Sequence, residues 1–193
     1  MYKRQILHRH GFVNSRSAST PGAGKPLHLK LGTLLNDGNK QLCQEFVGSL
    51  IYVSTCTRWD IAYSVIQLTR AMSNPKDENM VAARRVLRYL KGTPDLCVRC
   101  SKDFTVHGNS DASHSDDPNN SRSVSGYLYM FAGGPVTWSS KKQPVVALSS
   151  CETEYIARAY AIQEAVYLQV SVCELTFPQF ASCLLYTSPS PRD

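Results

Sequence analysis

Two acidic residues in the second half of the sequence stand where their carboxylates could bind a metal ion together. Asp111 closes a short β-strand expected over residues 104–111, and Glu154 lies in the first turn of a helix expected from about Ser149. A strand end and a helix start can converge across a sheet, and hard oxygen ligands suit Mg²⁺. Such ions can activate water for phosphodiester cleavage. Two unrelated surface acids would show the same spacing, so spacing alone does not choose between these readings.

A second candidate site is basic and lies in the first half. Four cations share or adjoin one face of a predicted helix, at spacings of one, three and four residues. They are Arg84, Arg85, Arg88 and Lys91. Such a face can follow a phosphate backbone, with an affinity that falls steeply with salt. The alternative is a solvated face opposite the apolar residues of the same helix.

The charge distribution divides the chain in the same way. The net charge is +6 over 193 residues, but residues 1–103 hold 16 Lys and Arg against 7 Asp and Glu. Residues 104–179 hold 4 against 7. This asymmetry favours a basic part that binds a polyanion next to an acidic part that binds a metal ion. Two ordinary domains of different net charge would show the same charge distribution.

The elements that would position these residues differ between the halves. Apolar residues recur at helical spacing over residues 41–91, which predicts a small helical unit. Its last helix begins at Lys76 or Asp77 and ends near Gly92. The first 40 residues show little periodicity, and Asn36–Asn39 has the composition of a turn.

The second half predicts strands and then a helix. Residues 124–131 and 135–139 form β-rich runs on either side of Gly133-Gly134, a pattern typical of a hairpin. Ser149 and Glu152 have the spacing of a capping box, which predicts a helix start. After Gln179 the sequence predicts no continuation of the fold. The fold class is therefore α/β.

Composition excludes several other classes. Hydrophobic residues make up 42% and charged residues 19%, which is typical of globular proteins. No apolar run approaches the roughly 18 residues of a transmembrane helix, so we expect no membrane partner. The seven cysteines follow no disulfide framework, which favours reduced thiols and an intracellular location, cytoplasmic or nuclear. Cys97 and Cys100 lack the second pair that a zinc site needs.

An ordered series of motifs runs through both halves of the chain. The motifs of the second half are Ser110-Asp111-Ala112, Asp117-Pro118, Arg122 to Tyr127, Trp138 to Gln143, Val146 to Ser150 and Glu152 to Ala157. They resemble the ribonuclease H domain of a known family, the Pol polyproteins of copia-type LTR retrotransposons. Those of the first half are Val47 to Tyr52, Arg58 to Tyr63, Met72 to Pro75 and Arg85 to Thr93. They resemble the segment that joins reverse transcriptase to ribonuclease H.

The resemblance implies hydrolysis of RNA in RNA–DNA hybrids during reverse transcription. The family's site uses four carboxylates and two Mg²⁺ (or Mn²⁺) ions on a mixed five-stranded sheet. Asp111 matches the first carboxylate and Glu154 the second, so both are expected to be catalytic metal ligands. Arg84, Arg85, Arg88 and Lys91 are expected to contact nucleic acid. The implied partners are an RNA–DNA hybrid and the rest of the Pol polyprotein, including its reverse transcriptase part.

The sequence departs from the family at three carboxylates. Ser113 stands two positions after Asp111, where the family's strand usually carries an extra acid that is not one of the four metal ligands. The matching sequence stops near residues 174–179, before the strand that carries the third carboxylate, so the third and the fourth are both missing. Two carboxylates cannot hold two ions firmly, although Mg²⁺ is often bound by one or two carboxylates plus substrate phosphates. We therefore expect the chain to be inactive or nearly so.

The expected organisation follows from these matches. Residues 1–40 are the end of the polymerase part and a linker, and residues 41–103 are a helical connection unit. Residues 104–179 are a partial ribonuclease H-like domain, with a three-stranded antiparallel start and its first helix. Residues 180–193 are expected to be a non-native tail, and residues 1–5 also look like library sequence.

Two other interpretations remain open at this point. The chain could be a non-catalytic remnant that binds nucleic acid. It could also be an unstable, pseudogene-like product, because half a sheet leaves an unpaired edge. The 2′-hydroxyl that distinguishes RNA from DNA could be sensed by Asn109, Ser110 or Ser150.

Overall fold

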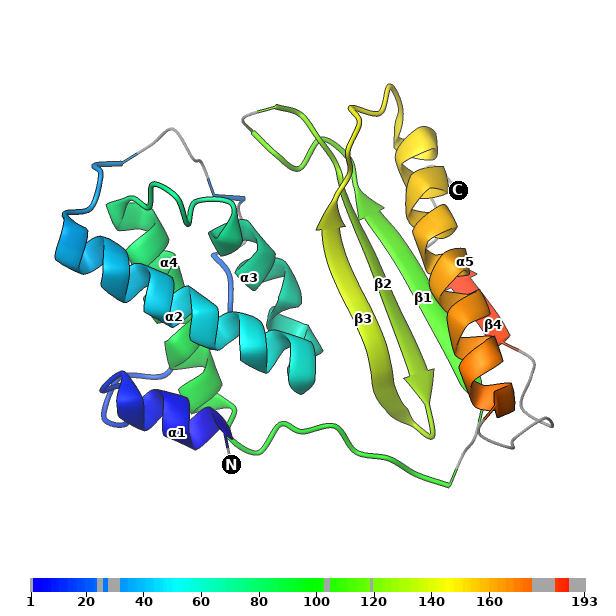
Figure 1. Ribbon diagram of the computed structural model, residues 1–193, viewed down its shortest axis with the longest axis horizontal. Coiled ribbons are helices and arrows are strands. Elements are labelled where there is room, and N and C mark those ends of the chain that lie inside the picture. Colours follow the sequence, from blue (N-terminus) through cyan, green and yellow to red (C-terminus); the bar gives the residue numbers. More distant parts are fainter. Residues whose placement is uncertain are drawn as a thin grey trace. The chain divides into compact units, whose positions relative to one another are not determined.

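The computed structural model describes residues 2–23, 26–27, 32–102, 105–118, 120–174 and 183–187. The chain forms two compact units, Met1–Cys97 and Val98–Asp193, and each is described by itself (Figure 1).

The first unit is helical. Its elements are α1 (Tyr2–Arg9), α2 (Asp37–Cys56), a short 3₁₀ turn (Trp59–Ile61), α3 (Ala62–Thr69) and α4 (Asp77–Gly92). Apolar side chains from the four α-helices and the 3₁₀ turn form one core, in which Leu50, Ile61 and Leu87 are fully buried. The predicted helical unit is thus confirmed, and Asp77 and Glu78 in the first turn of α4 complement its dipole.

The N-terminal boundary of this unit corrects the sequence-based expectation. We expected little regular structure in the first 40 residues, but α1 forms there and buries Ile6 and Leu7 in the core. Likewise, α2 begins at Asp37, inside the predicted turn, because the Asn36 side chain accepts a hydrogen bond from the Asn39 N–H at 3.0 Å. Asn is favoured at turns and at helix caps for the same chemical reason, so composition could not separate the two.

A buried ionic network fastens the 3₁₀ turn to the end of α4. The Arg58 side chain is only 1% exposed and donates to both carboxylate oxygens of Asp60, at 2.8 and 2.7 Å. It also donates to the carbonyl and hydroxyl oxygens of Thr93, at 3.0 and 2.7 Å. The Tyr89 hydroxyl donates to Asp60 at 2.8 Å. Each charge in this network therefore meets a partner.

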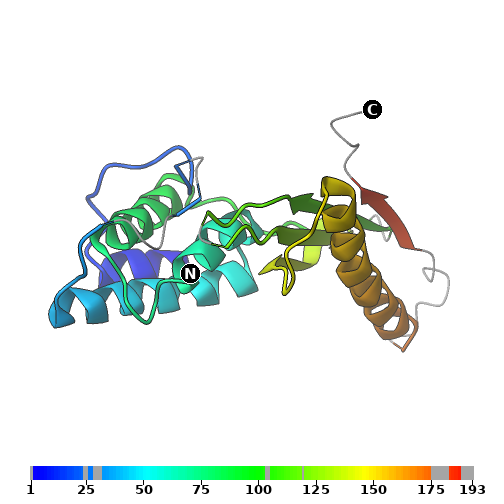
Figure 2. The same cartoon turned by 90° about the horizontal axis from the view of Figure 1, so that it is seen from above.

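The second unit is a sheet with one long helix. Its elements are β1 (Val106–Ser113), β2 (Val124–Phe131), β3 (Gly134–Lys142), α5 (Ser150–Glu174) and β4 (Cys183–Thr187). The strand order is β3-β2-β1-β4, with β1, β2 and β3 antiparallel. Helix α5 packs on the sheet against β1 and β2 (Figure 1, Figure 2). The α/β class and the three-stranded antiparallel start agree with the sequence-based prediction.

Two local features explain the register of this sheet. The β2–β3 turn consists of Ala132 and Gly133, both with positive φ (53° and 70°), so it lies one residue earlier than the predicted Gly133-Gly134 turn. Gly108 on β1 faces Tyr129 on β2, and a Cβ at Gly108 would lie 2.2 Å from the Tyr129 ring. Gly108 thus makes room for Tyr129, whose hydroxyl donates to the Ala161 carbonyl of α5 at 2.6 Å.

The fourth strand corrects the expectation that the fold ends after Gln179. Residues Cys183–Thr187 pair in parallel with Val106–Ser110 of β1. The short run Leu-Leu-Tyr-Thr is compatible with a strand, and its backbone pairs with the edge of β1. The Pro- and Ser-rich residues after this run made a strand hard to predict from the sequence. Of the tail interpreted as non-native, residues 180–182 and 188–193 lie outside the described residues.

Candidate functional site

The structure brings Asp111 and Glu154 close enough for their charges to interact. Asp111 is exposed near the end of β1, and Glu154 lies in the first turns of α5 with its side chain half-buried. The backbone N–H of Ala112, next to Asp111, donates a hydrogen bond to the Glu154 carboxylate. A strand end and a helix start therefore meet as the sequence pattern suggested.

The start of α5 is capped in a way that separates two neighbouring acids. The Glu152 N–H donates to the Ser149 hydroxyl at 3.1 Å, and the Glu152 carboxylate accepts from the Leu148 N–H at 2.7 Å. The predicted pairing of Ser149 with Glu152 is confirmed. Because Glu152 is occupied at the cap, Glu154 is the acid of this turn that reaches β1.

The electrostatic environment of Glu154 disfavours its ionised form. Burial raises its pKa, and the negative charge of Asp111 raises it further. The charge of Arg158 and the Ala112 N–H act in the opposite direction without cancelling the shift. Within the described residues, Glu154 Oε2 is buried and accepts no hydrogen bond. The oxygen atoms of these two neighbouring carboxylates are of the ligand type that hard divalent cations prefer.

A polar cluster fixes the first turns of α5 against the sheet. Gln143 is 1% exposed, and its Nε2 donates to the Ser125 hydroxyl at 2.8 Å and to the Thr153 carbonyl at 3.0 Å. His114 Nδ1 lies 2.9 Å from the Thr153 hydroxyl. Sequence reasoning assigned Gln143 and Thr153 no role, although both fall within the motifs that carry the resemblance. Their partners are distant in sequence, so spacing alone could not have found them.

The loop between β1 and β2, next to Asp111, is also held firmly. Asp117 is fully buried and forms an ion pair with Lys142 at the end of β3. Its N–H donates to the Arg122 carbonyl at 3.0 Å. Ser110, one of the candidates for contact with a 2′-hydroxyl, is buried beside this region, whereas Asn109 is exposed.

The count of possible metal ligands is limited. Among the residues that the structure describes, no group of three or more His, Cys, Asp or Glu side chains could hold a metal ion. Asp111 and Glu154 are a pair. Ser113, at the position of the family's additional acid, donates to Asp116 at 3.3 Å.

The four basic residues predicted to contact nucleic acid fall into two pairs. Arg85 donates to the Gly22 carbonyl at 3.1 Å and to the Thr20 hydroxyl at 2.8 Å. Lys91 donates to the Ser15 carbonyl. These two side chains fasten the preceding segment to α4. Arg84 and Arg88 are exposed, and their side chains have no hydrogen-bonded or ion-paired partner among the described residues.

Comparison with known proteins identifies relatives along nearly the whole chain. A retrovirus-related Pol polyprotein from transposon TNT 1-94 of Nicotiana tabacum is 39% identical over 188 residues, 92% of this chain and 14% of that protein. The corresponding protein from transposon RE1 of Arabidopsis thaliana is 35% identical over 177 residues, 90% of this chain and 12% of that protein. An uncharacterized mitochondrial protein of Arabidopsis thaliana is 32% identical over 175 residues, 88% of this chain and 70% of that protein.

The matches cover only a small part of the two Pol polyproteins. The chain spans about one seventh or less of the two Pol polyproteins. It matches no protein-family model and no solved structure. Among the described residues, no helix is both long and apolar enough to cross a membrane. On the similarity along its length, the chain belongs to the family of retrovirus-related Pol polyproteins of transposons, as a copia-type Pol fragment.

Proposed function

We propose that the second unit is the ribonuclease H-like part of this Pol fragment, and that its parent activity is hydrolysis of RNA in RNA–DNA hybrids. The observation that carries the proposal is the pairing of Asp111 with Glu154, whose buried Oε2 accepts no hydrogen bond among the described residues. The mixed sheet with a helix after its third strand is compatible with such a fold. The proposed setting is intracellular, with the rest of Pol as partner.

The donor set fits a hard divalent cation. Asp111 and Glu154 offer only oxygen atoms, the ligand type that Mg²⁺ and Mn²⁺ prefer. Both residues would hold the ion. A bound cation would supply the positive charge that lowers the pKa of a water and stabilises the leaving oxygen.

The residues of the chain itself prepare this site. The Ala112 N–H orients the Glu154 carboxylate, while Gln143 and Thr153 fix the turn of α5 that carries it. Since the pKa of Glu154 is raised, an entering cation must displace a proton over a range that extends above the ordinary value of 4.5. Cation affinity should therefore increase as pH rises through this range.

The described residues provide two carboxylates, and efficient two-ion chemistry needs more ligands. We therefore propose that these residues alone cleave a hybrid poorly or not at all. A second candidate function, binding of nucleic acid without catalysis, is favoured by the exposed guanidinium groups of Arg84 and Arg88, which have no hydrogen-bonded or ion-paired partner among the residues that the structure describes.

The test is cleavage of a labelled RNA–DNA hybrid by the full chain with Mg²⁺ or Mn²⁺. Asp111→Asn is the site variant, and Glu174→Gln, an exposed acid at the far end of α5, is the matched control. We expect at most slow cleavage, which Asp111→Asn abolishes and Glu174→Gln retains.

If the chain shows no cleavage of the hybrid, a chimeric protein provides the decisive test. The chain is extended at its C-terminus by a strand that carries the family's third carboxylate. We expect this chimera to cleave and to lose cleavage on Asp111→Asn. Cleavage that survives Asp111→Asn, or a folded chimera that never cleaves, contradicts the proposal.

A further inference from the structure

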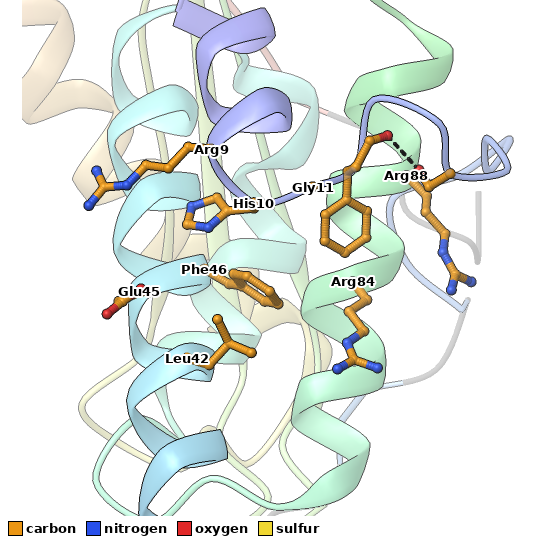
Figure 3. Close-up of a pocket in the computed structure, with 10 residues that line it drawn as sticks. Arg9, His10, Gly11, Leu42, Glu45, Phe46, Arg84 and Arg88 are labelled. Atoms are coloured by element: carbon orange, nitrogen blue, oxygen red, sulfur yellow. Dashed lines mark hydrogen bonds between the residues drawn. The ribbon is translucent and has the colours of Figure 1, made fainter.

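Two neighbouring hollows in the first unit share one arginine. The first has a volume of about 440 Å³ and lies where the end of α1 meets α2 and α4. Arg9, Arg84 and Arg88 line it (Figure 3). The second has a volume of about 340 Å³ and is lined by Arg16, Arg85 and Arg88. Arg88 therefore stands between two basic hollows.

The first hollow has basic residues on both sides. In Figure 3, Arg84 and Arg88 extend from α4 on one side, and Arg9 lies across from them beyond His10 and Phe46. The ring of Phe46 packs edge-on against His10, with centroids 4.9 Å apart. The packed rings of His10 and Phe46 thus lie between Arg9 on one side of the hollow and the two arginines of α4 on the other.

The charges in these hollows are largely uncompensated. Arg9, Arg16, Arg84 and Arg88 are all exposed, and none of their side chains has a hydrogen-bonded or ion-paired partner in the part of the chain that the structure describes. Of the residues lining the first hollow, Glu45 is the one acid, and the residues lining the second include none. Arg84 and Arg88 are also four residues apart on α4, where like charges repel. An anion bound between them would relieve this repulsion.

The hollows are built on a fixed framework. Arg85 and Lys91 donate to the segment of residues 15–22, and the Ala18 N–H donates to the Arg88 carbonyl at 3.3 Å. This segment places Arg16, together with the Ser17 and Ser19 side chains, along the second hollow. Serine side chains and arginines are the groups that commonly contact phosphate oxygens.

We infer that the two hollows bind successive phosphates of one nucleic-acid strand, with Arg88 between them. The phosphate track is defined here as Arg9, Arg84, Arg88 and Arg16. The track runs across α4 and continues onto the segment of residues 15–22. The sequence-based prediction instead placed all contacts along α4 and included Arg85 and Lys91. A polyanion suits two adjoining sites better than a single small phosphate does. The inference rests on the proposal that the fragment handles nucleic acid, but it needs neither metal nor cleavage.

The test measures binding of a labelled RNA–DNA hybrid to the full chain by fluorescence anisotropy at several salt concentrations. Arg88→Ala is the site variant, and Arg4→Ala, an exposed arginine of α1 that lines neither hollow, is the matched control. We expect Arg88→Ala to weaken binding about tenfold, as befits a charged hydrogen-bonding partner. The slope of log K against log salt should fall by about 1 to 2, and Arg4→Ala should change neither quantity.

Further arms separate this inference from the proposed function. Arg88→Lys should restore the salt slope but only part of the affinity, because lysine lacks the guanidinium fork. Thermal unfolding should show that Arg88→Ala is folded, since its side chain is exposed. Arg88-dependent binding would support the track whether or not the chain cleaves, because the chimera, and not binding, tests the nuclease. Equal losses in Arg88→Ala and Arg4→Ala, or a site that takes inorganic phosphate but no hybrid or single strand, would overturn the track.

Discussion

The two units treat their buried charges in opposite ways. In the first, Arg58 is almost completely buried, and its guanidinium donates to Asp60 and Thr93. Burial opposes ionisation of Asp60, but hydrogen bonds from Arg58 and Tyr89 outweigh it and hold the pKa of Asp60 below its ordinary value. In the second, Glu154 is half-buried beside another acid, and its pKa is raised.

The difference separates structural from functional charge. A charge whose partners are all supplied by the fold stabilises that fold, and removing one partner leaves the other buried and unpaired. A charge placed beside a like charge lowers the stability of the fold. Such pairs are typical of functional sites, where a bound ligand of opposite charge compensates them. On this criterion Arg58 and Asp60 stabilise the first unit, whereas Asp111 and Glu154 are the pair at which we propose a cation binds.

The largest expected effect is therefore in the first unit. Asp60→Asn should destabilise this unit by about 3–5 kcal/mol, because Arg58 is left buried without its carboxylate. The protein has two tryptophans, Trp59 in the first unit and Trp138 in the second, so single-tryptophan variants report each unit separately during denaturation. Asp95→Asn, at an exposed acid, is the control. An unchanged midpoint at Trp59 would show that the network is not structural.

A smaller loss is expected when the scaffold of the second unit is disturbed without touching its carboxylates. Gly108→Val should cost about 1–3 kcal/mol or more, because the new side chain would collide with the Tyr129 ring. Denaturation followed at Trp138 measures this. Equal stability of the variant would mean that Tyr129 can move aside freely.

The cap of α5 should matter less again. Ser149→Ala removes the hydroxyl that accepts from the Glu152 N–H and should cost about 1 kcal/mol. The same Trp138 signal follows it. A loss as large as that of Gly108→Val would point to a further role for the Ser149 hydroxyl.

The smallest effect carries the opposite sign and depends on pH. Because the folded pKa of Glu154 is raised, the folded state holds more protons than the unfolded state between about 4.5 and the raised value, and stability falls as pH rises through this window. Glu154→Gln should therefore be slightly more stable than wild type at pH 7 without divalent ions. The difference should vanish below about pH 4.5. A variant that is less stable at pH 7 would assign Glu154 a structural role.

Sequence reasoning succeeded where local chemistry was sufficient. The helical unit, the hairpin and the pairing of Ser149 with Glu152 follow from periodicity, turn residues and cap spacing, and the structure contains them. The position of Asp111 and Glu154 at a strand end and a helix start drew attention to them, but only the resemblance assigned them a catalytic role, since their spacing fits many ordinary acids. That they meet depends on how α5 packs on β1, which no local pattern encodes.

The misses share a physical cause, which is tertiary contact. Helix α1 is short and forms where Ile6 and Leu7 reach a core made by distant helices. Strand β4 is defined by the free edge of β1 that it pairs with. The separation of Arg85 and Lys91 from Arg84 and Arg88 depends on residues 15–22 lying across α4, a contact that helix periodicity cannot reveal.

The most direct measurement is Mn²⁺ binding to the full chain, followed by the loss of the free-ion signal in electron paramagnetic resonance. Wild type, Asp111→Asn, Glu154→Gln and the control Glu174→Gln are titrated at neutral pH. We expect wild type and Glu174→Gln to bind one ion that Mg²⁺ displaces, and both site variants to lose it. Equal binding in all four proteins would contradict a cation site at Asp111 and Glu154.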